Sequence, residues 1–186
     1  KLQVLTPGLS HMLHMSSHIY IRTGHYKEGV EVNEKAIKAF EQYKKIYPDV
    51  EKYIGIYYKH NLAMEFANAM FLPDYKLVEE LAKAIRSSVI KSKTLMDNLS
   101  INEQYCYVSP YLAWIRYGKW DSILAEKKIP EHLVYASFFQ HFASGMALAG
   151  KHKSLEAEEQ LSEMNRLIDH PNLQVHPAGE NSPVII

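Results

Sequence analysis

Arg22-Thr23-Gly24-His25-Tyr26 separates two amphipathic helical patterns, and it returns in altered form as Arg116-Tyr117-Gly118-Lys119-Trp120. The glycine of each stretch is free to take the left-handed conformation that closes a helix. Two further stretches occupy the same kind of position: Phe71-Leu72-Pro73-Asp74-Tyr75, which lacks the glycine, and Ala149-Gly150-Lys151-His152. A helix–turn–helix unit that recurs along a chain is typical of a stacked solenoid. The sequence therefore predicts an all-α fold, a stack of about four helix hairpins.

Hydrophobic spacing places the helices of these hairpins. In the first hairpin, Val30, Ala36 and Phe40 recur at helical spacing, and Asn33 shares their inward stripe. Residues 91–103 are polar, and a single helical turn is the most that we expect there. Helices are expected at residues 12–23 and 26–47, 53–71 and 74–90, 109–117 and 120–126, and 131–149 and 154–168.

The helical pattern extends over most of the chain, so we expect one helical-repeat domain at residues 1–170. Pro177, Gly179 and Pro183 oppose regular structure, and residues 171–186 are expected to form an irregular C-terminal tail. The chain begins at a lysine and ends on apolar residues, which favours a fragment of a longer protein. Uncapped terminal repeats make self-association an expected property of such a fragment.

Composition excludes several classes of function. Lysine plus arginine equals aspartate plus glutamate, 21 each among 186 residues, so no global field favours nucleic acid. Cys106 is the one cysteine, which excludes an internal disulfide and a cysteine-based zinc site. No apolar run approaches the roughly 18 residues of a membrane span. The compartment stays open, since a targeting signal can lie outside the chain, and a cytoplasmic location is only slightly favoured.

The first hairpin resembles a tetratricopeptide repeat (TPR). That pattern has an aromatic or small residue in its first helix, a glycine at the turn and an aromatic two positions later, followed by a small residue and an alanine. Tyr20, Gly24, Tyr26, Gly29 and Ala36 match it in order. The other hairpins match less fully and the turns are irregularly spaced, so the resemblance is to a divergent, TPR-like protein. The resemblance implies that the hairpins stack as a right-handed α-α superhelix.

One part of this resemblance is more particular. Residues 8–22, with His14-Met15-Ser16-Ser17-His18-Ile19-Tyr20 at their centre, resemble a phrase found in a group of uncharacterised bacterial TPR proteins. Tyr57-Tyr58-Lys59-His60-Asn61 resembles a second phrase of the same group. That group tends to have proline where this chain has Ser16, which favours a helix start near Met15. The resemblance brings no established activity.

Four histidines lie in these two phrases. In a continuous helix over residues 8–23, the side chains of His11, His14 and His18 would share one face, and His60 would approach them from the next hairpin. Neutral imidazoles of this kind can ligate zinc, nickel or copper, or act as a general acid or base. A helix start near Met15 weakens that alignment, and buried histidines also serve packing by hydrogen-bonding carbonyls or tyrosine hydroxyls. No carboxylate lies between His11 and His18, so the metalloprotease motif is absent.

These patterns lead to three hypotheses. The first is a non-enzymatic interaction scaffold without a cofactor, whose concave groove binds a peptide, a protein or the missing parts of its own chain. The second is a small-molecule or metal site that holds a divalent ion such as zinc, with catalysis open, and the third is a purely structural spacer. The expected groove residues of the scaffold are Tyr20, Arg22, His60, Asn61, Tyr111 and Trp114. The expected metal ligands are His11, His14, His18 and His60.

Overall fold

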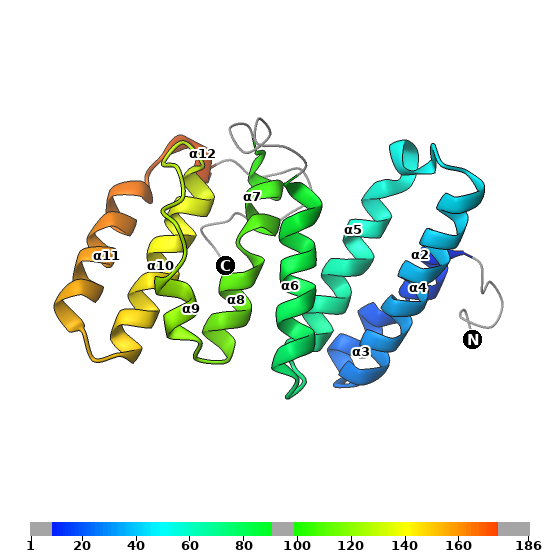
Figure 1. Cartoon of the computed structure of the whole chain (residues 1–186), viewed down its shortest axis with the longest axis horizontal. Helices are drawn as coiled ribbons and strands as arrows, with labels where there is room; N and C mark the ends of the chain where they lie inside the picture. Colours follow the sequence, from blue (N-terminus) through cyan, green and yellow to red (C-terminus); the bar gives the residue numbers. More distant parts are fainter. Residues whose placement is uncertain (1–8, 91–98, 175–186) are drawn as a thin grey trace. The chain divides into compact units, whose positions relative to one another are not determined.

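A computed structural model describes residues 9–90 and 99–174 of the chain (Figure 1). Within these ranges every regular element is a helix, which confirms the all-α prediction. None of the described helices is long and apolar enough to cross a membrane. The chain divides into two compact units, Lys1–Ile85 and Arg86–Ile186, where the sequence pattern suggested one domain. Each unit is described by itself.

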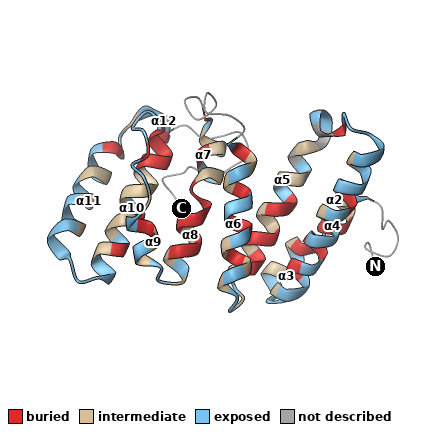
Figure 2. Cartoon of the chain, viewed as in Figure 1, coloured by how far each residue is buried: buried red, intermediate tan, exposed pale blue. Residues whose placement is uncertain are grey.

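The first unit is built on a pair of long helices. It contains α2 (Ser10–His14), α3 (Ser17–Thr23), α4 (Tyr26–Ile46), α5 (Val50–Ala69) and most of α6 (Tyr75–Val89). Helices α4 and α5 pack along each other, and both α2 and α3 contact each of them. Figure 2 shows buried and exposed residues alternating along these helices, as expected for amphipathic segments.

The packing of α4 against α5 is antiparallel and close. The Phe40 and Tyr58 rings meet near the loop end of the pair, and Gly29 and Asn68 meet near the other end. A Cβ atom at Gly29 would overlap with the Asn68 side-chain oxygen, so the two helices approach within a distance that only glycine allows. The core around this pair consists of apolar side chains that include Leu13, Val30, Ala36, Phe40, Leu62, Phe66 and Ala69.

The second unit packs around one apolar helix. It contains α7 (Ile101–Tyr107), α8 (Ser109–Arg116), α9 (Trp120–Leu124), α10 (Val134–Gly150), α11 (Ser154–Leu167) and α12 (Pro171–Gln174). Helix α10 contacts each of the other five. Half-buried Arg86 lies over the rings of Tyr107, Tyr111 and Trp114, and its guanidinium pairs with Glu126 at 3.0 Å.

Several expected elements need correction. The segment expected as one helix at 12–23 forms two short helices with a break at Met15 and Ser16. Helix α7 begins at Ile101, inside the polar segment, behind a capping box made by Ser100 and Glu103. Helix α12 lies at the start of the segment expected to be irregular; the rest of that segment, 175–186, lies outside the described residues.

The turn glycines behave in two ways. Gly24 (φ 79°) and Gly118 (φ 63°) are left-handed, as predicted from their positions at helix ends. Gly150 instead belongs to α10, and the left-handed residue of that turn is His152 (φ 60°). A Cβ atom at Gly150 would lie 2.7 Å from the Trp120 ring, so close approach to this ring explains the glycine there.

Candidate metal centre

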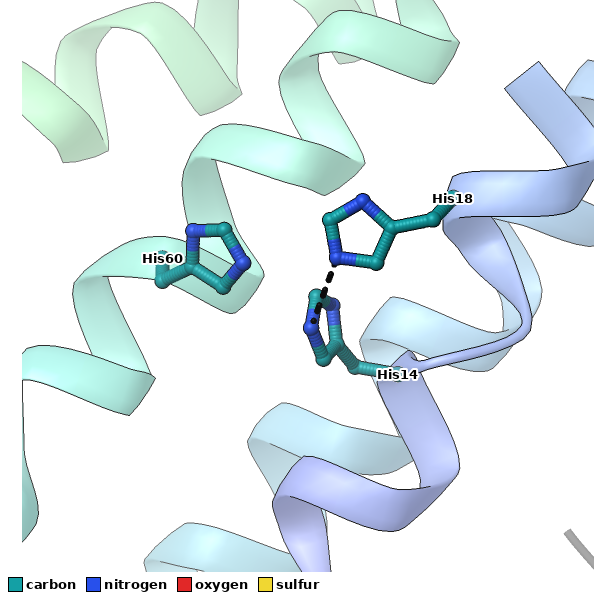
Figure 3. A group of neighbouring side chains, drawn as sticks. All are labelled: His14, His18 and His60. Carbon is teal, nitrogen blue, oxygen red and sulfur yellow. Dashed lines mark hydrogen bonds between the residues drawn. The ribbon is translucent and has the colours of Figure 1, made fainter. Parts of the chain in front are cut away.

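Three histidines converge inside the first unit. His14 ends α2, His18 lies in the first turn of α3, and His60 lies in α5 (Figure 3). One ring nitrogen from each lies within 4.8 Å of the other two. Across residues 9–90 and 99–174, no other three histidine, cysteine or carboxylate side chains form such a group.

The break between α2 and α3 keeps His14 and His18 together. Met15 (φ −52°, ψ −31°) and Ser16 (φ −68°, ψ −23°) both keep right-handed helical dihedrals, so the chain continues to wind through the break. The Ser16 carbonyl accepts the amides of Ile19 and Tyr20 and starts the second helix. Because the winding is preserved, histidines four positions apart still share one side. The structure thus has neither the continuous helix over residues 8–23 nor a helix that starts at Met15. His14 and His18 nevertheless lie on the same side.

An amide inside the unit holds His14 in place. His14 is fully buried, and its Nδ1 atom lies 3.2 Å from Asn33 Oδ1. Asn33 donates its own Nδ2 to the Gly29 carbonyl at 2.8 Å, which leaves Oδ1 as the acceptor facing the imidazole. This network assigns the proton of neutral His14 to Nδ1. Its Nε2 lone pair therefore points toward His18, at 3.3 Å from His18 Nε2.

Burial and mutual repulsion keep this imidazole uncharged. Burial, followed by the nearby His60, lowers the pKa of His14 to about 4, against a smaller opposing effect of the Asn33 hydrogen bond. His60 is exposed on one side, and the burial of its other side, followed by His18 and His11, lowers its pKa as well. Since a metal ligand must be an unprotonated imidazole, both rings are ready to bind an ion at neutral pH.

The spacing of the nitrogens fits a tetrahedral ion. Zn–N bonds of about 2.0–2.1 Å place two imidazole nitrogens about 3.3 Å apart across a tetrahedron. The 3.3 Å between His14 Nε2 and His18 Nε2 equals this edge. The His60 ring is 4.7 Å from the His14 ring between centroids, and its nitrogen lies within 4.8 Å of those of His14 and His18. Three nitrogen donors suit zinc, copper or nickel, and leave one tetrahedral position open.

The fourth predicted ligand, His11, lies beside this group. Its ring centroid is 5.3 Å from that of His14 and 4.6 Å from that of Tyr57. Its Nδ1 atom is buried and has no hydrogen-bond partner among the residues that the structure describes. His11 is therefore a neighbour of the candidate centre, and the ligand set that the structure brings together is His14, His18 and His60.

The six predicted groove residues are divided between the two units. Tyr20, Arg22, His60 and Asn61 belong to the first unit, whereas Tyr111 and Trp114 belong to the second. Asn61, Tyr111 and Trp114 are buried, and their side chains pack inside their own units rather than lining an open surface. Asn61 donates to Ser10 Oγ at 2.8 Å and so ties α5 to α2 next to His60.

Two supporting amides have a role in this site that sequence patterns do not reveal. Spacing predicts Asn33 in the inward stripe of its helix and Asn61 in the groove. The readable signal for Asn33 is a polar amide on an otherwise apolar stripe, since a buried amide needs partners. Its partner, His14, lies 19 positions away, and spacing alone does not identify it.

Comparison with protein-family models, with curated proteins and with solved structures finds no match to this chain. The functional argument therefore rests on the geometry of the described residues.

Proposed function

We propose that this protein binds one divalent transition-metal ion, zinc being the best fit, through His14, His18 and His60. The observation that carries the proposal is the convergence of three imidazole nitrogens within 4.8 Å. The tetrahedral edge between two of them and the amide that fixes the His14 tautomer support it. His18 and His60 each meet the His14 ring edge-on, and their own rings are stacked, so all three rings share one small space.

Three protein ligands leave room for a water molecule or a substrate atom. This is the pattern of catalytic zinc sites, whereas structural sites close the fourth position with protein. A bound zinc ion supplies Lewis acidity at such a position. The chain's own contribution is to hold the ion: His14 is fixed from inside by Asn33, and His60 lies at the exposed edge of the group.

We further propose that the helix hairpins form a divergent TPR-like stack. The left-handed Gly24 between α3 and α4 and the close crossing at Gly29 support this relationship. The scaffold hypothesis stays a prediction, and the metal site is preferred because three of the six expected groove residues are buried.

The test is metal binding by the full chain without a histidine tag. We expect about one zinc ion per chain by elemental analysis, with saturable binding in calorimetry. His18→Ala or His60→Ala removes a ligand, so each should weaken binding by more than the roughly 10–100-fold typical of losing an outer-shell partner.

His132→Ala is the matched control, because His132 is exposed and lies in the second unit. It should bind zinc like the unaltered chain. Zinc binding that is absent, or that survives both ligand substitutions, would contradict the proposed function.

A further inference from the structure

An apolar pocket lies next to the candidate metal centre within the first unit. It opens between α2, α4 and α5 and encloses about 300 Å³. Its walls are formed by Leu9, Ser10, His11, Met12, Ala39, Phe40, Tyr43 and Tyr57. None of these side chains is an acid, a lysine or an arginine, and three of them are phenylalanine or tyrosine rings.

The pocket has the size and wall of a small-molecule site. Ligand pockets in proteins span roughly 300–1,000 Å³ and are lined mainly by apolar and aromatic side chains. Its rim exposes apolar surface to water: Leu9 is 58%, Tyr43 44% and Tyr57 38% exposed. An apolar occupant that covers this rim gains roughly 25 cal/mol for each Å² removed from water. The volume suits one or two fused rings and is too small for a helix of a partner protein.

One part of the wall is polar. The Ser10 hydroxyl accepts a hydrogen bond from Asn61 Nδ2 at 2.8 Å, and this bond uses an oxygen lone pair rather than the hydroxyl proton. No acceptor for the hydroxyl proton is recorded within residues 9–90 and 99–174, which favours an occupant that carries an acceptor such as a carbonyl oxygen. An uncharged occupant is favoured because the lining offers no charge to pair with a buried ion.

His11 connects this pocket to the metal centre. Its ring forms part of the pocket wall, packs on Tyr57 at 4.6 Å and lies 5.3 Å from the ring of His14. An occupant of the pocket therefore touches a side chain that packs directly on a candidate metal ligand.

We infer that this pocket binds a small, uncharged, mostly apolar molecule with a hydrogen-bond acceptor, and that its occupancy is coupled to the metal centre through His11. The second half of this inference rests on the proposed function, and the first half stands without it. For a metal-binding protein, the pocket would hold the apolar body of the molecule on which the centre acts.

The probe for this inference is prodan, an uncharged naphthalene ketone whose emission moves to shorter wavelength in apolar surroundings. The full, metal-free chain should bind it saturably, with one site per chain. Ala39→Met extends a side chain into the pocket and should weaken binding by about tenfold or more. Ala84→Met makes the same change at an exposed position of α6 and should leave binding unchanged.

Tyr57→Ala provides a second variant, because this ring is partly exposed and its removal strips one wall from the pocket. Far-ultraviolet circular dichroism shows whether each variant is folded. Absent probe binding, or equal affinity in the unaltered chain, folded Ala39→Met and Tyr57→Ala, would overturn the pocket assignment.

The coupling is tested by repeating the titration with zinc. Saturating zinc should change the affinity for prodan by about threefold or more, and His60→Ala should abolish this change while keeping metal-free probe binding. Zinc binding without probe binding overturns the pocket alone, and probe binding without zinc binding overturns the proposed function alone. An unchanged probe affinity in zinc-loaded protein overturns the coupling.

Discussion

At the scale of single residues, the candidate centre depends on how one amide divides its hydrogen bonds. Asn33 donates to the Gly29 carbonyl and accepts from His14, so both ends of the amide are committed. The imidazole is thereby held with its unprotonated nitrogen toward the other two rings. A partner of this kind orients a metal ligand and fixes its tautomer.

Asn33→Ala should therefore weaken zinc binding by roughly 10–100-fold, as loss of an outer-shell partner does. The reason is that His14 loses the acceptor that holds its ring, while all three ligands remain. Calorimetry with zinc measures the effect.

Asn68→Ala is the matched control for this prediction. Asn68 is likewise buried, and its Nδ2 donates to the carbonyl four residues earlier, Met64, at 2.8 Å. The Asn68→Ala variant should lose about as much stability as Asn33→Ala, but it should bind zinc with the affinity of the unaltered chain. Equal zinc affinities for the two variants would show that Asn33 serves packing alone.

At the scale of helices, the approach of α4 to α5 depends on Gly29. The Asn68 side chain occupies the position where a Cβ atom at Gly29 would lie. This crossing sets the distance between the helix that carries Asn33 and the helix that carries His60.

Gly29→Ala should lower the free energy of unfolding by about 1–3 kcal/mol, the usual cost of overpacking a core. Thermal or urea unfolding gives the value. In the double variant with Asn68→Ala the overlap is removed, so most of the loss attributed to Gly29→Ala should disappear.

Gly145→Ala makes the same change in α10 as a comparison. Its Cβ atom would lie 3.5 Å from Gln160 Cβ, an ordinary contact, and alanine favours a helix over glycine by up to about 1 kcal/mol. This variant should be neutral or stabilised. A Gly29→Ala chain as stable as Gly145→Ala would show that α4 and α5 separate without cost.

The helices themselves were largely readable from the sequence, and the exceptions have physical causes. Gly24 and Gly118 mark turns because each needs a positive φ that side chains resist. Helix α7 was missed because its polar composition masked the capping box of Ser100 and Glu103. The break at Met15 leaves no signature in hydrophobic spacing, since the chain keeps helical dihedrals through it.

The candidate site was readable only in part. The recurrence of histidines at positions 11, 14, 18 and 60 pointed to candidate ligands, but not to the three that meet. That selection depends on ring orientation, which is set by contacts between distant residues such as His14 and Asn33. The apolar pocket also needs three helices together, and no local pattern describes it.

At the scale of the whole molecule, two buried titratable groups in the first unit act on stability in opposite directions. Burial, followed by the nearby Glu34, raises the pKa of Glu65 to about 7, against an opposing effect of Lys38. Below pH 4.5 this carboxyl is protonated in the folded and unfolded chain alike. Between pH 4.5 and about 7 the Glu65 carboxyl is ionised in the unfolded chain but still protonated in the folded chain. The free energy of unfolding therefore falls as pH rises through this range.

His14 has the opposite effect in the metal-free chain. Its pKa is about 4 in the folded chain, against the ordinary histidine value of 6.5, so the unfolded chain takes up a proton first as pH falls below 6.5. Stability is then lost toward low pH. Between pH 4.5 and 6.5 the two groups largely offset each other.

Glu65→Gln should remove the loss of stability that ionisation of Glu65 causes as pH rises. The variant should be more stable than the unaltered chain by about 3 kcal/mol at pH 8, and close to it at pH 4.5. Its stability should also fall more steeply below pH 6.5, because His14 then acts unopposed. Urea unfolding of the metal-free protein across this pH range measures both effects.

Glu80→Gln, at an exposed position of α6, is the control and should follow the unaltered chain at every pH. If the stability of Glu65→Gln also equals that of the unaltered chain at every pH, burial does not raise the pKa of Glu65, and this prediction is wrong.

The three imidazoles differ in their access to water, since His14 is buried, His18 is intermediate and His60 is exposed. If the proposed ion binds, His60 is the ligand most open to solvent, so exchange is expected on its side. A chelator arriving from solution would displace His60 first, and the buried His14 would be the last ligand to dissociate. Exchange of the ion would thus follow a fixed order, with release governed by the outermost side chain.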